Sequence, residues 1–242
     1  MHRFFIPPEW ISQSEVIIIG EQAHQMRSVL RLKYGDRIVV LDNSGSEYEI
    51  TLVDITVKQV TGKIVEKRLS SGEPTVEITL YQSMLKGGKL DIVLQKCTEI
   101  GVTRFVPMIC HRSIARIPGN NRENRWRKIV LESAEQSRRG KIPVLEPMID
   151  FSQACERADG VSLMPWEESS ELGIRSAMSK AGKANKVNIF IGPEGGFTGD
   201  EIELARSYGI IPITLGKRIL RAETAGMVVA SIIGYENGEM GS

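Results

Sequence analysis

Two segments near the carboxyl terminus carry the residue types that a ligand-binding loop needs. The first, Gly192-Pro193-Glu194-Gly195-Gly196, follows an apolar stretch typical of a buried strand. Glycine permits positive φ angles and lets the backbone approach a ligand closely, so this loop is a candidate binding site. The second segment, 216–225, also follows an apolar stretch and contains Arg221 and Glu223 two positions apart. Both segments could equally be ordinary turns, with Arg221 and Glu223 forming a local ion pair.

The residues after the glycine loop indicate which ligand it suits. Thr198 and Glu201 match the Ser/Thr-x-x-Glu capping box, which occupies the free N–H donors at a helix start. Asp200 and Glu203 add negative charge at the same place. A phosphate site needs those donors and a nearby lysine, and the loop also lacks the full G-x-G-x-x-G spacing. The pattern therefore favours a neutral or cationic ligand over a nucleotide triphosphate.

Strands and helices that alternate from residue 75 onward would position these loops, and this order predicts a largely parallel sheet. We expect strands at 76–81, 102–109, 161–164, 187–191 and 210–215, and helices at 89–100, 122–139, 169–180, 198–208 and 223–236. Ligands bind at the carboxyl ends of parallel strands, so both loops would lie at one edge of the sheet. A third strand end, Leu163-Met164-Pro165-Trp166, could present apolar bulk to a flat heterocycle, although Trp166 fits the core equally well.

The first seventy residues have a different pattern, with short strands joined by tight turns and one helix. Strands are expected at 16–19, 37–41, 47–53 and 57–65, and the helix at 23–32. Such a pattern is typical of a small β-barrel. Residues 67–74 have the composition of a linker, which predicts two domains, 1–72 and 73–242.

Composition excludes several classes of protein. With 242 residues, 41% of them hydrophobic and 25% charged, the chain can bury a core and is not disordered. No apolar stretch approaches the ~20 residues of a membrane span, and no signal-peptide pattern occurs at the start. The cysteines, Cys97, Cys110 and Cys155, form no CxxC pair. This usage disfavours disulfides and a zinc site and favours a reducing cytoplasm.

The net charge is only +1, but positive charge is concentrated in residues 104–141. This block holds ten Lys and Arg residues against three Asp and Glu residues. It could face phosphates, as in nucleic-acid binding, or an acidic protein. An arginine-rich solvated helix face explains the count equally well.

The two carboxyl-terminal segments also carry a family resemblance. Residues 192–196, together with Leu-Gly-Lys-Arg-Ile-Leu-Arg-Ala-Glu-Thr-Ala at 215–225, resemble the bacterial ribosomal RNA small subunit methyltransferase E family of the SPOUT superfamily. Further matches extend along the chain at His24, 29–31, 95–101, Pro107, 112–113, Glu132, 135–136, Arg139 and Pro143.

The resemblance implies a fold and an activity. The fold is α/β, with an amino-terminal PUA-like β-barrel that helps hold RNA and a carboxyl-terminal SPOUT-type domain containing a trefoil knot. The activity is methylation of N3 of a uridine in 16S ribosomal RNA with S-adenosyl-L-methionine, on the assembled 30S subunit. A cytoplasmic homodimer without metal or membrane is expected. The alternatives are a SPOUT methyltransferase for another RNA position and a non-catalytic RNA-binding assembly factor.

The resemblance also implies roles for individual residues. Cofactor contacts are expected from Leu163, Met164, Pro165, Ile191, Gly192, Pro193, Gly195, Gly196, Leu215, Gly216, Ile219, Leu220, Thr224 and Ala225. Uracil N3 is mostly protonated at neutral pH; a carboxylate can take the proton, and an arginine can stabilise negative charge on the flanking carbonyl oxygens. The expected catalytic residues are Arg139, Glu194 and Arg221, with Glu99 and Glu223 as other candidate bases. Phosphate contacts are expected from Arg3, His24, Arg27, Arg31, Lys86, Lys96 and Arg112.

Overall fold

The chain divides into two compact units, each with its own sheet and core. A computed structural model describes residues 1–114, 119–169, 172–182 and 184–241. The amino-terminal unit comprises Met1–Glu73 and Ala134–Ile142, and the carboxyl-terminal unit comprises Pro74–Ser133 and Pro143–Ser242. The first division lies one residue beyond the expected joint at 72. No sequence pattern had indicated that Ala134–Ile142 belong with the first unit.

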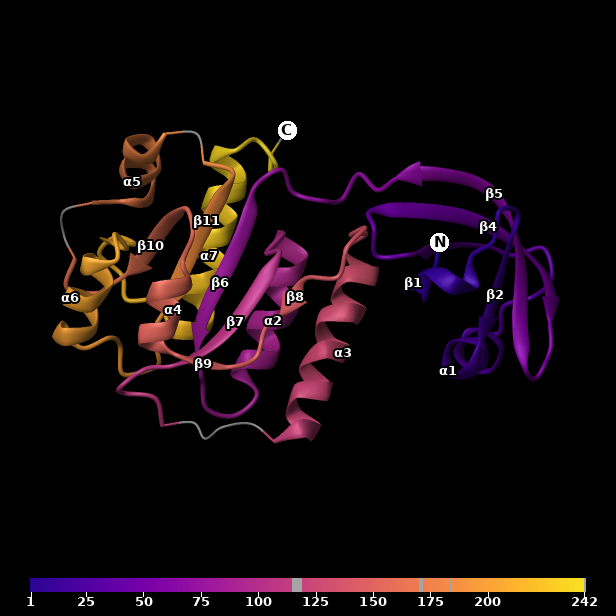
Figure 1. Ribbon diagram of the computed structural model, residues 1–242, viewed down its shortest axis with the longest axis horizontal. Helices are drawn as coiled ribbons and strands as arrows, with labels where there is room; N and C mark the ends of the chain where they lie inside the picture. The colour runs from indigo at the N-terminus through magenta and orange to yellow at the C-terminus, as the bar shows by residue number, and fades with distance from the viewer. Residues whose placement is uncertain (115–118, 170–171, 183, 242) are drawn as a thin grey trace. The chain divides into compact units, whose positions relative to one another are not determined.

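The amino-terminal unit is built on a five-stranded sheet (Figure 1). Its strands are β1 (Arg3–Phe5), β2 (Glu15–Ile19), β3 (Arg37–Leu41), β4 (Ser46–Ile55) and β5 (Gln59–Leu69), and a 3₁₀ turn, η1 (Pro8–Trp10), follows β1. The strand order is β1-β3-β4-β5-β2, with β1 parallel to β3 and the other pairs antiparallel. Strand β1 was not predicted, because three residues before a Pro-Pro pair are too few to show an alternation.

The helix expected at 23–32 is wrong in its position and in its kind. An α-helix, α1 (Gly20–His24), runs directly into a π-helical turn, η2 (Gln25–Val29). Ala23 and Met26 are buried as predicted, but the Val29 side chain is 66% exposed. A π-turn adds one residue to the helical turn, so it rotates Val29 out of the apolar stripe that a 3.6-residue period predicts.

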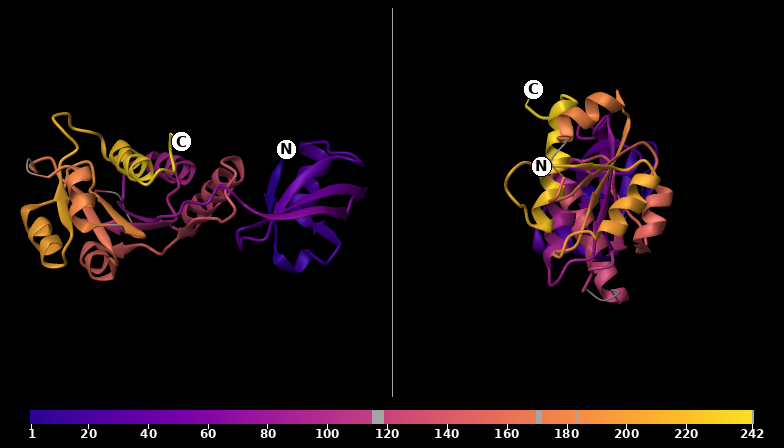
Figure 2. Two further views of the ribbon diagram at one scale, coloured as in Figure 1. Left: turned by 90° about the horizontal axis from the view of Figure 1, so that it is seen from above. Right: turned by 90° about the vertical axis from the view of Figure 1, so that its left-hand side faces the viewer.

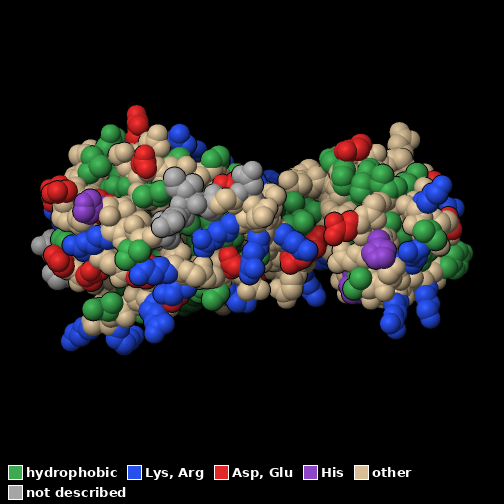
Figure 3. Space-filling view, turned by 90° about the horizontal axis from the view of Figure 1, so that it is seen from below, with side chains coloured by type: hydrophobic (Ala, Val, Ile, Leu, Met, Phe, Trp, Pro, Cys, Tyr) green, Lys and Arg blue, Asp and Glu red, His purple; other side chains and the backbone are tan. Residues whose placement is uncertain are grey.

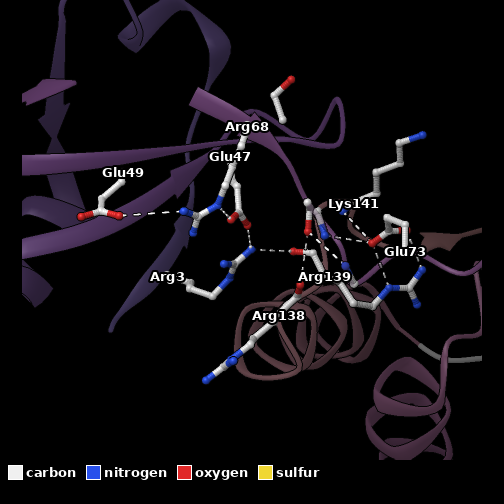
Figure 4. A network of polar contacts seen from close by, with 12 residues as sticks. Arg3, Glu47, Glu49, Arg68, Glu73, Arg138, Arg139 and Lys141 are labelled. Carbon is white, nitrogen blue, oxygen red and sulfur yellow. Dashed lines mark hydrogen bonds and ion pairs between the residues drawn. The ribbon is translucent and has the colours of Figure 1, made fainter. Parts of the chain in front are cut away.

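Strand β5 extends into the segment that was expected to be a linker. Its Arg68 lies opposite Glu47 of β4, and the Arg68 Nε donates to Glu47 Oε1 at 2.6 Å. Arg3 of β1 donates to the other oxygen, also at 2.6 Å (Figure 4). Burial alone raises the pKa of Glu47, but the hydrogen bonds and positive charge of Arg3 and Arg68 outweigh burial and hold this pKa below its ordinary value. The paired carboxylate therefore ties three strands together.

This ion pair predicts an acid-dependent loss of stability. Because the folded-state pKa of Glu47 is lowered, its contribution is complete above the unfolded value of about 4.3 and is lost as pH falls through the folded value. We expect Glu47→Gln to weaken β4–β5 by about 1.5–3 kcal/mol at pH 7, and the difference from wild type to shrink below pH ~4. Hydrogen exchange of β4 and β5 amides at several pH values measures this. A difference that does not change with pH would contradict the assignment.

The carboxyl-terminal unit contains a parallel sheet, as expected. Its order is β12-β10-β11-β6-β7-β8, with β9 also pairing with β7. The strands are β6 (Glu77–Ser83), β7 (Arg104–Ile109), β8 (Val144–Leu145), β9 (Ile149–Asp150), β10 (Val161–Pro165), β11 (Lys186–Ile191) and β12 (Ile211–Ile213). The two-residue strands β8 and β9 were missed, because a pair of residues carries no periodicity.

Helices cover both faces of this sheet (Figure 2). One face carries α2 (Lys89–Ile100) and α7 (Ala222–Glu236), while α4 (Phe151–Arg157) and α6 (Gly199–Ser207) cover the core around Tyr81 and Phe190 on the other. The remaining helices are α3 (Asn120–Gln136) and α5 (Ile174–Ala181). The expected helix at 169–180 includes residues 170 and 171, which lie outside the described residues. Helix α4 was missed although Asp150 and Gln153 form a capping box at its start.

The three cysteines are free thiols inside the carboxyl-terminal unit. Burial raises the pKa of Cys97, Cys110 and Cys155 to about 12. A buried thiol with such a pKa holds almost no thiolate at pH 8, and the thiolate is the reactive form. We expect no alkylation of the native protein by iodoacetamide at pH 8 and three alkylated cysteines in denaturant, measured by intact mass. Rapid native alkylation of any of them would contradict this burial.

Two further findings concern the described residues only. None of their helices is both long enough and apolar enough to cross a membrane. Among the same residues, no group of three His, Cys, Asp or Glu side chains is arranged to hold a metal ion.

Candidate functional site

The glycine loop follows β11, at the carboxyl edge of the parallel sheet. The capping box predicted beside it is confirmed. Thr198 Oγ1 accepts from the Glu201 N–H at 3.2 Å, and Glu201 Oε2 accepts from the Thr198 N–H at 2.8 Å. The other Glu201 oxygen accepts from the His111 N–H at 2.8 Å. At the start of α6, backbone N–H donors are therefore occupied and a buried carboxylate is present. Both features disfavour the binding of an anion there.

At three glycines of this loop, a side chain would come into close contact with neighbouring residues. A Cβ at Gly192 would stand 3.1 Å from the Phe197 ring. One at Gly195 would stand 3.3 Å from Arg112 Cβ. Gly196 has φ +68°, and a Cβ there would lie 2.7 Å from Glu167 Oε1. A side chain at Gly196 would meet both steric overlap and an unfavourable backbone conformation.

Arg112, which follows β7, holds the glycine loop from two strands away in the sheet. Its Nη1 donates to the carbonyl oxygens of Gly195 at 2.8 Å and Phe197 at 3.3 Å. Hydrogen bonds from a charged donor are stronger than neutral ones, so this guanidinium fixes the loop. The sequence suggests Arg112 as a phosphate contact, and in the structure its guanidinium contacts these loop carbonyls.

Lys89 brings the two candidate loops together. Its Nζ lies 3.5 Å from Glu194 Oε1 in the glycine loop and 3.5 Å from Glu223 Oε2 at the start of α7. Lys89 is the first residue of α2, directly after the turn that follows β6. The two segments singled out by their sequence are therefore neighbours, joined through one ammonium group.

Glu194 is fixed by hydrogen bonds rather than left free. Its Oε1 also accepts from the Lys86 N–H at 3.0 Å. Burial raises the pKa of Glu194, but backbone hydrogen bonds, including that from Lys86, and the charge of Lys89 outweigh burial and lower it. A carboxylate with a lowered pKa is a weaker base, so these contacts suit a loop anchor better than a proton acceptor.

The second loop connects β12 to α7. Leu215 is half-buried, Gly216 has φ +96°, and its N–H donates to Thr214 Oγ1 at 3.1 Å. Helix α7 has Arg221 as its N-cap residue, without a side-chain cap. The Arg221 side chain is 82% exposed and reaches to 3.9 Å from Glu223. Ile219 is 86% exposed, Leu220 and Thr224 are half-buried, and Ala225 is buried.

The third strand end lies beside these loops. Pro165 pairs with Ile213 of β12, and the Trp166 N–H donates to the Ile213 carbonyl at 3.0 Å. Leu163 and Met164 are fully buried in β10, and Trp166 is partly buried against the core. The expected cofactor residues of 163–165, 191–196 and 215–225 thus all belong to one edge of the carboxyl-terminal unit.

Arg139 is not among the residues gathered at this edge. It belongs to the amino-terminal unit, and its side chain is only 3% exposed. Its Nη2 donates to Glu73 Oε2 at 3.1 Å, while Glu73 Oε1 accepts from the N–H groups of Gly140 and Lys141 at 2.9 and 3.1 Å (Figure 4). These contacts attach Ala134–Ile142 to the first unit.

The residues expected to contact RNA are distributed over both units. His24, Arg27 and Arg31 lie on or next to α1 and η2, and His24 and Arg31 are exposed. Arg3 is 11% exposed and paired with Glu47, and Lys96 is paired with Glu99 at 2.9 Å. Lys86 is exposed beside the glycine loop. Figure 3 shows Lys and Arg side chains on the surface of each unit. Arg116 of the basic block lies outside the described residues.

Several of these contacts, at the sheet edge and around Arg139, involve residues that the sequence did not single out for these roles. Lys89 as the link between loops and Glu167 beside Gly196 depend on which segments meet in space, so no local pattern shows them. Glu73, the partner of Arg139, lies in the segment 67–74 whose composition predicted a linker. The Asp-x-x-Gln pattern at 150–153 is a local signal for the start of α4.

Comparison with known proteins agrees with this geometry. A family model described as an RNA methyltransferase domain matches residues 72–234, and an RNA methyltransferase PUA domain matches 18–65. The ribosomal RNA small subunit methyltransferase E of Synechocystis is 32% identical over 96% of this chain and 77% of its own length. The enzyme of that name from Bacillus subtilis is 31% identical over 98% of this chain and 97% of its own length.

A solved structure matches the whole chain. The ribosomal RNA small subunit methyltransferase E of Neisseria gonorrhoeae, bound to S-adenosyl methionine, has 28% identity and a TM-score of 0.89, covering 98% of both chains. The PUA-like unit and the parallel-sheet unit with its two glycine-bearing loops thus define an RNA methyltransferase. More narrowly, the chain belongs to the ribosomal RNA small subunit methyltransferase E family.

Proposed function

We propose that the chain methylates N3 of a uridine in 16S ribosomal RNA with S-adenosyl-L-methionine, acting as a cytoplasmic homodimer on the assembled 30S subunit. The observation that carries the proposal is the meeting of the glycine loop and the 215–225 loop through Lys89. The names of the relatives support the RNA substrate, and the cofactor in the Neisseria structure supports the methyl donor.

The residues at this edge fit S-adenosylmethionine, which supplies an electrophilic methyl group on a sulfonium. The glycines leave space that a Cβ would fill, and the α6 capping box leaves no donors for a phosphate. Residues 163–165, 191–196 and 215–225 would hold the cofactor, with Arg112 and Lys89 keeping the loops in position. In the family, these loops belong to a trefoil knot, which we expect here as well.

At the substrate, the chain must remove the proton from uracil N3 and stabilise the negative charge that this leaves on the base. Glu194 is tied to Lys86 and Lys89, so we assign it to loop positioning. Glu223 Oε2 also lies 3.5 Å from Lys89 Nζ, but unlike Glu194 it is buried and accepts no hydrogen bond within the described residues, so we assign this carboxylate to take the proton. The exposed Arg221 can steady negative charge on a uracil carbonyl oxygen. N3 lies on the pairing edge, so the uridine must be unpaired when it enters.

The homodimer is supported by the surface of α7. This helix is apolar on most sides, and Met227, Val228 and Ile232 remain half-exposed while Tyr235 is exposed. An apolar helix face that stays partly open in a single chain is typical of a subunit interface. Sedimentation at micromolar concentration should show a single dimeric species.

Two measurements test the proposal. Calorimetry should detect S-adenosylmethionine binding to the purified protein, and absence of binding would remove the enzyme assignment. In the second, 30S subunits from a strain without the gene should lack one N3-methyluridine, which the protein and cofactor should restore. Methylation of naked ribosomal RNA fragments at the same rate would contradict the assembled-subunit substrate.

A further inference from the structure

A glutamate that the sequence did not single out faces the glycine loop. Glu167 follows β10, one residue after Trp166, whose N–H is bonded to Ile213. Its two carboxylate oxygens lie 2.7 and 3.1 Å from the position that a Cβ on Gly196 would occupy. Only a glycine at 196 leaves room for this carboxylate to lie against the loop backbone.

Glu167 is exposed, and no group in the described part of the chain balances its charge. Across the described residues, the Glu167 carboxylate has no hydrogen bond and no ion pair. Two cationic side chains that contact the glycine loop are already engaged, since Arg112 binds the Gly195 and Phe197 carbonyls and Lys89 binds Glu194 and Glu223. An unpaired anion at a ligand-binding loop is stabilised when a positive charge arrives within ~4 Å.

We propose that Glu167 is a cofactor-binding residue that pairs with a positive charge of S-adenosylmethionine. This inference rests on the proposed function and names one residue of that site. The cofactor offers two cationic groups, its sulfonium and its α-ammonium, and the chemistry of recognition is the same for both. A carboxylate in this position strengthens binding of the cationic donor while adding nothing for a neutral adenosine derivative.

The test compares Glu167→Gln with wild type by calorimetry, using three ligands. S-adenosylmethionine carries both cationic groups, S-adenosylhomocysteine carries only the ammonium, and 5′-methylthioadenosine carries neither. We expect about a tenfold loss of S-adenosylmethionine affinity and unchanged 5′-methylthioadenosine affinity. A matching loss for S-adenosylhomocysteine identifies the ammonium as the partner, and an unchanged S-adenosylhomocysteine affinity identifies the sulfonium.

Glu168→Gln is the matched control, because it removes the same charge from the next residue, which does not face Gly196. It should keep S-adenosylmethionine affinity within twofold of wild type. The thermal midpoint of ligand-free Glu167→Gln should equal that of wild type, since Glu167 has no partner to lose within the described residues. Equal losses for all three ligands, or no loss for any, would overturn the inference. Failure of the wild type to bind S-adenosylmethionine would instead remove the proposed function.

Discussion

Gly196→Val is expected to weaken S-adenosylmethionine binding about 100-fold, or roughly 2.7 kcal/mol, while the protein remains folded. Gly196 has φ +68°, where a β-branched residue is strained, and its Cβ would lie 2.7 Å from Glu167 Oε1. To accept valine, the loop must change its conformation and displace the carboxylate. Calorimetry measures the affinity, and circular dichroism with thermal unfolding checks the fold.

Two other glycines in the same region provide graded controls. Gly199→Ala should bind as wild type does, because a Cβ there meets nothing within 4 Å. Gly195→Val should show an intermediate loss, since its Cβ would stand 3.3 Å from Arg112 Cβ, a smaller overlap than at Gly196, and Gly195 does not have a positive φ. Wild-type affinity in Gly196→Val would show that the glycine loop is not a wall of the cofactor site.

Parts of the fold with a regular period were predictable from the sequence, and parts determined by contacts were not. Helix α2 occurs at its predicted bounds, because its apolar stripe is regular and Gly101, at φ +113°, ends it. The long helix α3 stops three residues before the predicted end, and Arg138 adopts φ +63° beyond it. That ending depends on the Glu73 contacts, which join residues more than sixty positions apart.

The candidate site divides in the same way. The capping box and the glycine loop could be predicted, because each is a local sequence pattern within 192–201. The roles of the charged residues could not be predicted, because the role of a guanidinium or carboxylate depends on the group that it contacts in the fold. Arg112 binds loop carbonyls, Glu194 binds the Lys86 N–H, and Arg139 is buried with Glu73. Each of these partners lies at least sixty residues away in the chain.

Arg139→Ala is expected to destabilise the attachment of Ala134–Ile142 by about 2–3 kcal/mol. Removing one partner of a buried ion pair typically costs 3–5 kcal/mol, and the 21% exposure of Glu73 places this pair below that range. Glu73 would also keep its two backbone donors. The direct measurement is amide exchange at Gly140 and Lys141, whose N–H groups bind Glu73. Their exchange should accelerate roughly 30- to 150-fold.

Arg138→Ala is the matched control, because it removes the same charge from the adjacent, exposed side chain. It should leave the Gly140 and Lys141 exchange rates within about threefold of wild type. The pair of variants also decides between two roles for Arg139. If Arg139→Ala abolishes methylation while both amides stay protected, the guanidinium acts on the substrate, as the family resemblance implies. If methylation falls only in proportion to the loss of amide protection, Arg139 acts through Glu73 by holding Ala134–Ile142 in place. Arg221 is then the arginine that stabilises negative charge on the substrate.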